Sequence, residues 1–298
     1  MLATAAGAVI LALGGCLGTS AHRHSTTLAG AGVLRVGLSA LDVDPDRLDP
    51  QRSFTGSSVE LFRCCLLRTL LSYRGVPTEQ GGGVLRPDLA SGMPTVSADG
   101  RTWTFHLKPG LRYAPPFERD TIRGGDFVRA IERLLRLAPA PYLAQYFLVI
   151  EGATAFAAHQ TDSIAGLETP DPQTLIVHLT RPTGDFGNRV ALPPAAPLPP
   201  GAADNHPHDY GRFMAASGPY MIAGSQRLRG PTARPVAGFV PGRSLTLVRN
   251  PSWARASDRL RPARVDRIEV KIGGTASDLA REVGKQGRRA FLLFGTTG

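Results

Sequence analysis

Residues 96–113 read VSADGRTWTFHLKPGLRY, and this stretch is the most informative part of the sequence about the fold. Two segments with strand-like patterns flank Asp99-Gly100, a dipeptide typical of tight β-hairpin turns. In the second segment Trp103, Phe105 and Leu107 share one face of the strand through its two-residue period, which predicts that they belong to the core. The sequence therefore predicts a β-hairpin with one buried face.

Helical and strand patterns alternate on both sides of this hairpin, which predicts a mixed α/β fold. A first helix is expected to begin at Ser57, because Glu60 follows three residues later in the pattern of a capping box. Further strands are predicted over residues 34–38, 174–179, 220–222, 245–248 and 267–272, and further helices over 126–135 and 277–283.

Cys64 and Cys65 are adjacent inside the first predicted helix. We interpret them as small buried hydrophobic residues, because free cysteine is among the most buried residue types. A vicinal disulfide formed after export is the less favoured alternative.

The N-terminus is typical of an export signal. Residues 1–15 are uncharged with an apolar centre, too short to span a bilayer but suited to a signal peptide, although a positive n-region is missing. Leu13-Gly14-Gly15-Cys16 resembles a bacterial lipobox, which predicts a lipid attached to Cys16 and a flexible tether over residues 16–32. The alternative is a cleaved secretory peptide in which Cys16 has no special role.

Composition excludes several classes of protein. The chain has 298 residues, 42% hydrophobic and 19% charged, which excludes a disordered chain. Three cysteines are too few for a disulfide scaffold. The formal net charge is +10, but the arginines that supply most of it are spread along the chain, which favours a solvated surface over a nucleic-acid partner.

No catalytic motif is present in the sequence, and neither a cofactor nor a metal is predicted. His206, His208 and Asp209 are metal-ligating residue types, but Pro207 and the loop composition make this a weak signal. The absence of these motifs does not by itself decide whether the protein is an enzyme.

Six segments, in order along the chain, resemble the solute-binding proteins of peptide, oligopeptide and nickel ABC importers, known as family 5. These segments are residues 47–50, 85–90, 96–113, 126–133, 217–220 and 247–253. The resemblance implies a type II periplasmic-binding-protein-like fold, with a mixed sheet and an inserted hairpin subdomain. It also implies that the protein is not an enzyme. The expected ligand is a peptide or other small solute, the expected partners are ABC permease subunits, and the expected location is the outer face of the cytoplasmic membrane.

Members of this family have two lobes and are much longer than this chain. We therefore expect that residues 33–272 form an incomplete first lobe and that residues 273–298 begin a crossover toward a missing second lobe. Because clefts form at strand ends, the predicted ligand contacts are Ser53, Phe54 and Thr55; the alternative is that these are loop residues without a ligand. A non-functional remnant, a cell-envelope interaction protein and, less favoured, a secreted hydrolase are the alternative functions.

Overall fold

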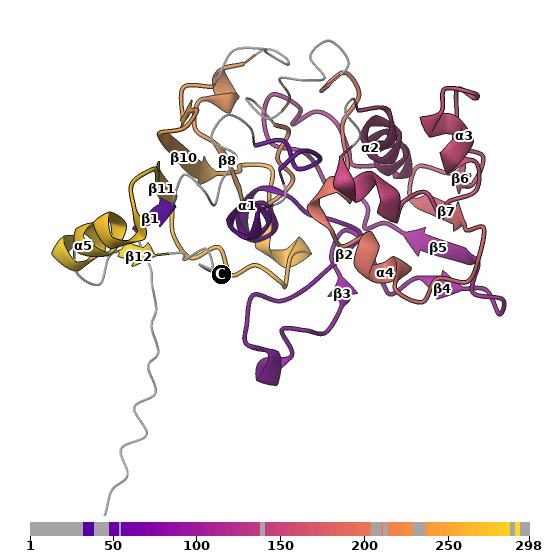
Figure 1. Cartoon of the computed structure of the whole chain (residues 1–298), viewed down its shortest axis with the longest axis horizontal. Helices are drawn as coiled ribbons and strands as arrows, with labels where there is room; N and C mark the ends of the chain where they lie inside the picture. The colour runs from indigo at the N-terminus through magenta and orange to yellow at the C-terminus, as the bar shows by residue number, and fades with distance from the viewer. Residues whose placement is uncertain are drawn as a thin grey trace, which may run out of the picture.

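The computed structural model describes residues 32–38, 48–53, 55–137, 141–203, 210, 214–228, 236–286 and 290–292. The predicted signal peptide and Cys16, residues 206–209 and Phe54 lie outside this part of the chain. Two sheets lie side by side over one continuous hydrophobic core (Figure 1). This mixed α/β arrangement confirms the predicted fold class.

The larger sheet is mixed, with parallel strands at one side and antiparallel strands at the other. Its main order is β12 (Ala290–Leu292), β1 (Val33–Leu38), β11 (Arg267–Ile272), β10 (Ser244–Arg249), β8 (Tyr220–Ile222), and β9 (Phe239–Val240) pairs with β10. In the parallel register Val36 lies opposite Val270 and Leu38 opposite Ile272, so buried residues of both strands face the core.

Helix α5 (Ala276–Gln286) packs closely against β1. A Cβ atom at Gly37 would lie 2.8 Å from the Leu279 side chain, so glycine is what allows this approach. Strand β12 pairs with β1 in the larger sheet, and α5 packs against β1. The domain boundary after residue 272 stays a prediction.

The predicted hairpin forms one side of the smaller sheet, with its first strand at the edge. Its strands are β4 (Thr95–Val96), β5 (Thr102–His106), β7 (Thr174–His178) and β6 (Leu167–Glu168), in that order. Trp103, Phe105 and Leu107 are at most 8% exposed, as the alternation predicted. A short pair, β2 (Leu71–Ser72) and β3 (Arg86–Pro87), lies between the two sheets in Figure 1.

Helix α2 (Gly124–Arg136) has an apolar face that includes Phe127, Ile131 and Leu134, all buried. The helix contacts α3 (Ala153–Ala157) and β7, and so covers the smaller sheet. The shorter α4 (Phe186–Arg189) packs near β2.

The first helix begins earlier than predicted. Helix α1 spans Gly56–Leu61, and its N-cap is Thr55, whose hydroxyl oxygen accepts a hydrogen bond from the Ser58 amide at 3.3 Å. Ser57 lies inside the helix, and Glu60 pairs with Arg63 at 2.7 Å. The capping-box prediction at Ser57 was wrong because a Thr two residues upstream supplies the cap.

The cap assignment predicts different costs for two small substitutions. Thr55→Ala should lower the free energy of unfolding by about 1 kcal/mol, because a helix amide loses its acceptor. Ser57→Ala is the matched control and should change it by less than about 0.5 kcal/mol. Urea unfolding of the full chain measures both, and an equal or larger loss for Ser57→Ala would contradict the assignment.

Candidate functional site

Four buried charged residues meet between the two sheets. Arg68, Asp88, Asp258 and Arg261, here called the buried charge cluster, are all at most 6% exposed. The Asp88 carboxylate accepts from Arg68 Nε and from Arg261 Nη2, each at 2.7 Å. Asp258 lies 3.2 Å from Arg261 and 3.7 Å from Arg68, so each guanidinium faces two carboxylates.

The remaining donors of the buried charge cluster are also satisfied. Arg68 Nη2 donates to the Asp88 and Ser257 carbonyl oxygens at 3.0 and 2.8 Å. Arg261 Nε donates to the Arg63 carbonyl oxygen at 2.6 Å. The cluster therefore joins the end of the first helix, the segment after β3 and the loop after β10, which are far apart in the sequence.

Burial alone would raise the pKa of the Asp88 carboxyl, but the guanidiniums of Arg261 and Arg68 outweigh burial and lower this pKa below its ordinary value. The Asp88 carboxylate is therefore stabilised in its charged form in the folded protein.

Next to the buried charge cluster, the backbone of residues 217–218 lies close to the backbone of residues 65–66. The Ser217 and Gly218 amides both donate to the Leu66 carbonyl oxygen, at 3.0 and 2.8 Å, and Asn250 Nδ2 donates to the Gly218 carbonyl oxygen at 2.8 Å. A Cβ atom at Gly218 would lie 2.5 Å from the Cys65 carbonyl oxygen, so only glycine fits. Segments 217–220 and 247–253, recognised in the sequence, thus meet at one point.

The predicted ligand residues lie at the start of α1. Segment 48–53 is fixed against α2, since Arg133 pairs with Asp49 at 2.6 Å and Gln51 donates to the Ala130 carbonyl oxygen at 2.6 Å. Ser53 is 3% exposed, and its hydroxyl has no hydrogen-bond partner among the described residues. Thr55 caps the helix, which sequence reasoning missed.

Cys64 and Cys65 form a vicinal disulfide in the π-helical turn Phe62–Leu66 that follows α1. Cys65 is buried, whereas Cys64 is exposed. The interpretation of both residues as buried thiols was therefore wrong, because the widened turn brings the two neighbouring sulfurs together.

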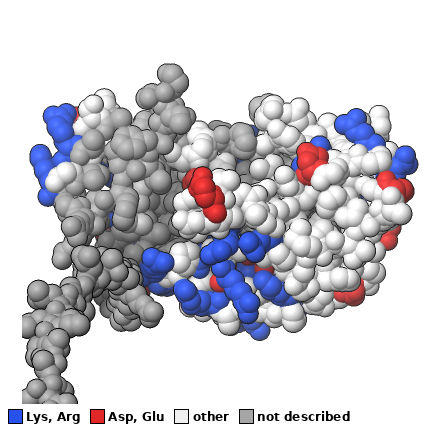
Figure 2. All heavy atoms as spheres, turned by 90° about the horizontal axis from the view of Figure 1, so that it is seen from below, with Lys and Arg blue, Asp and Glu red and all other residues white. Residues whose placement is uncertain are grey.

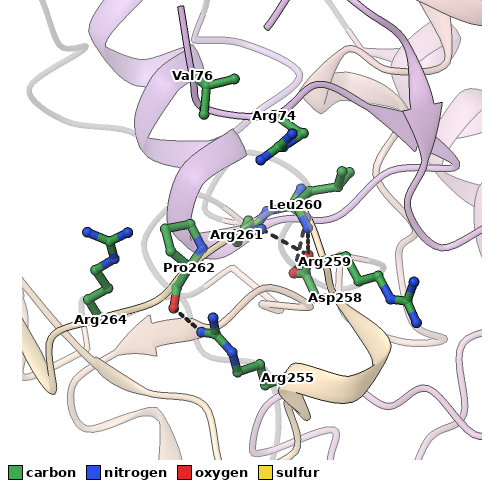
Figure 3. A pocket seen from close by; sticks show the side chains of 10 residues that line it. Arg74, Val76, Arg255, Asp258, Arg259, Leu260, Arg261, Pro262 and Arg264 are labelled. Carbon is green, nitrogen blue, oxygen red and sulfur yellow. Dashed lines mark hydrogen bonds and ion pairs between the residues drawn. The ribbon is translucent and has the colours of Figure 1, made fainter. Parts of the chain in front are cut away.

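The described part of the chain contains a larger and a smaller cavity that could hold a ligand. The larger, of about 580 Å³, opens beside the buried charge cluster and is lined by arginines from residues 74 and 255–264 (Figure 3). The smaller, of about 210 Å³, lies beside α2, between Arg136, Phe156 and Leu198 among others. Within the same part of the chain, no group of three metal-ligating side chains occurs and no helix is long and apolar enough to cross a membrane.

Removing one carboxylate tests the buried charge cluster. Asp88→Asn should lower the free energy of unfolding by about 3–5 kcal/mol, because it leaves two guanidiniums buried without full compensation. The control is Glu269→Gln at the exposed Arg35–Glu269 pair, 3.2 Å apart, which should cost at most about 1 kcal/mol. Similar losses for both variants in urea unfolding would contradict this role.

The lowered pKa of Asp88 also predicts a pH dependence. A group with a depressed folded pKa contributes stability above the unfolded value, near 4 for an aspartate, and loses this contribution as the pH falls through the folded pKa. The stability difference between the original chain and Asp88→Asn should therefore be full above about pH 5 and shrink in stronger acid. A difference that is independent of pH from 6 to 2 would contradict the lowered pKa.

Comparison with known proteins identifies a family to which the sequence of this chain is similar. The family model of bacterial extracellular solute-binding proteins, family 5 Middle, matches residues 84–293. No curated protein matches.

Solved structures agree with the family match. Clavulanic acid biosynthesis oligopeptide binding protein 2 is 34% identical, with a TM-score of 0.73 over 87% of this chain and 44% of that chain. Listeria monocytogenes OppA bound to peptide is 18% identical, with a TM-score of 0.66 over 87% and 46%. The Escherichia coli murein tripeptide binding protein MppA is also 18% identical, with a TM-score of 0.66 over 87% and 45%.

This chain therefore spans less than half the length of these relatives. Their fold is the periplasmic-binding-protein-like fold expected from the sequence, and their family consists of solute-binding proteins rather than enzymes. The chain belongs to family 5 of the bacterial extracellular solute-binding proteins.

Proposed function

We propose that this chain supplies the first lobe of a peptide-binding component of an ABC importer. The observation that carries this proposal is the 34% identity, over 87% of the chain, to an oligopeptide binding protein. Two further structural relatives are named for binding peptides or a murein tripeptide.

The architecture of the larger sheet supports a ligand position. Strands β1 and β11 end side by side at Leu38 and Ile272, and the Gly273 amide donates to the Leu38 carbonyl oxygen at 2.9 Å. Open α/β sheets bind ligands in the crevice outside the carboxyl ends of their strands. A peptide held at this edge would be enclosed when a second lobe closes over it.

The proposed ligand contacts remain Ser53, Phe54 and Thr55. The hydroxyl of Ser53 supports this choice, because a buried hydroxyl without a partner is costly unless it meets a hydrogen-bonding group. Segment 48–53 is held against α2 by the hydrogen bonds of Arg133 to Asp49 and of Gln51 to the Ala130 carbonyl oxygen. The backbone that leads into the candidate contacts is therefore fixed in position.

The family to which the chain belongs is extracellular, which supports export of this protein from the cytoplasm. We further propose that a lipid at Cys16 holds the protein at the outer face of the cytoplasmic membrane. Anchoring would keep the solute-binding lobe close to the permease subunits that receive the solute. A flexible tether over residues 16–32 would leave the lobe free to turn toward them.

Peptide binding is tested by calorimetry with the full chain. A mixture of random pentapeptides should give saturable heat, whereas an equimolar mixture of free amino acids should give none. Absence of peptide heat from folded protein would sink the transport proposal for this chain and favour the remnant or envelope alternatives.

The proposed contacts are tested on the same chain. Phe54→Ala should weaken peptide binding at least about tenfold if Phe54 contacts the peptide, since burying a large apolar side chain against a ligand contributes roughly 1.5–3 kcal/mol. Tyr142→Ala is the control, because Tyr142 is 65% exposed on another part of the lobe. Equal affinities in the two variants would remove residues 53–55 from the proposed site.

The anchor is tested by metabolic labelling with palmitate in bacterial cells. The original chain should incorporate label and Cys16→Ala should not, because the acyl group needs this cysteine. Ser20→Ala is the control and should label normally. Equal label in all three chains would rule out the anchor at Cys16.

A further inference from the structure

The larger cavity is lined by an unusual excess of arginine. Five arginines and one aspartate surround it, and this set, with the small and apolar residues between them, is here called the arginine pocket. Its members are Arg74, Gly75, Val76, Arg255, Asp258, Arg259, Leu260, Arg261, Pro262 and Arg264. Figure 2 shows a dense group of Lys and Arg side chains on the face that is turned downward in Figure 1.

The pocket has a neutralised base and a charged rim. At the base, Asp258 is 2% exposed. Its carboxylate pairs with Arg261 and accepts a hydrogen bond from Trp253 Nε1 at 3.0 Å, so its negative charge is already compensated. Figure 3 shows Arg74 at the top, Arg264 at the left, Arg259 at the right and Arg255 at the bottom of the group of lining side chains. The buried charge cluster thus holds in place the backbone segment that carries Arg255, Arg259 and Arg264.

The rim arginines have no acidic partner among the described residues. Arg74, Arg255, Arg259 and Arg264 are exposed. Within the described part of the chain, Arg255 Nη1 donates to the Pro262 carbonyl oxygen at 2.5 Å, and no carboxylate pairs with any of the four guanidiniums. Elsewhere exposed arginines of this protein do pair, as Arg35 and Arg267 do with Glu269. Guanidinium groups gathered without carboxylates match the geometry and charge of phosphate oxygens.

The arginine pocket lies at the edge of the sheet where β1 begins. The Gly32 carbonyl oxygen accepts from the Asp266 amide at 3.0 Å, and Gly32 lies against Val265, the residue after Arg264. The ends of β1 and β11 proposed to face the ligand lie at the opposite edge. The pocket is therefore separate from the proposed solute site.

We propose that the arginine pocket binds phosphate groups of anionic lipid headgroups and turns this edge of the lobe toward the membrane. The choice of a lipid rests on the anchor at Cys16 in the proposed function. A flexible tether over the 17 residues 16–32 would have a root-mean-square span of about 23 Å, which would keep Gly32 and the adjacent pocket near an anchored lipid. Each arginine that reaches an anionic surface strengthens binding by about fivefold.

The test measures binding of unlipidated full chain to vesicles, so it does not depend on whether Cys16 is modified. Vesicles of phosphatidylglycerol and phosphatidylcholine should bind the original chain more tightly than vesicles of phosphatidylcholine alone. Arg74→Gln combined with Arg264→Gln should weaken binding to the anionic vesicles by about thirtyfold. The control, Arg119→Gln combined with Arg181→Gln, removes the same charge from exposed positions elsewhere and should weaken it by less than about threefold.

Two results would overturn the proposal. Equal weakening by both double variants would mean that net charge alone drives binding. Calorimetric binding of pyrophosphate that requires Arg74 and Arg264, without any preference for anionic vesicles, would assign the pocket to a soluble phosphate compound. Urea unfolding of both double variants confirms that the compared proteins are folded.

Discussion

The buried charge cluster is the constraint on which the arrangement of this lobe depends. Four charges are removed from water at one point, and their mutual attraction offsets the desolvation cost only if every partner is in place. Asp88 needs both Arg68 and Arg261, and these come from segments almost two hundred residues apart. The cluster therefore selects one relative placement of the two sheets.

The segment after β10 serves both the interior and the surface. Asp258 and Arg261 point inward and complete the buried charge cluster, while Arg255, Arg259 and Arg264 remain exposed around the opening of the arginine pocket. The interior contacts hold the segment, so the exposed charges keep a defined spacing without pairing with carboxylates. Rigidity of the interior and recognition at the surface thus come from one short stretch of chain.

Much of the fold could be predicted from the sequence, because its periodic patterns are local. The alternation around Trp103 and Phe105 specified the hairpin, and six ordered segments indicated the family. The start of α1 was misplaced because Thr55 and Ser57 are both good caps, and the backbone geometry that selects between them is not visible in a sequence. The vicinal disulfide was the less favoured alternative, because the sequence pattern indicated an ordinary helix and not the π-helical turn in which the two cysteines lie.

The candidate sites were less predictable. Arg68 and Asp88 carry no local pattern that marks them as partners, since their pairing depends on long-range packing. The arginine pocket combines residues 74–76 with several residues of the segment 255–264. In the sequence these arginines are part of a positive charge that is spread along the chain. Residues 53–55 were selected by the rule that clefts lie at strand ends, and their role remains a proposal.

Native-state hydrogen exchange tests most directly whether the buried charge cluster holds the two sheets together. The Leu89 and Gly218 amides donate to carbonyl oxygens of Thr69 and Leu66 beside the cluster. If the cluster is the central constraint, these amides should exchange only through global unfolding, with the same opening free energy as the Phe105 amide inside the smaller sheet. Exchange at a much lower opening free energy would show that the sheets separate while each stays folded, and would contradict this account.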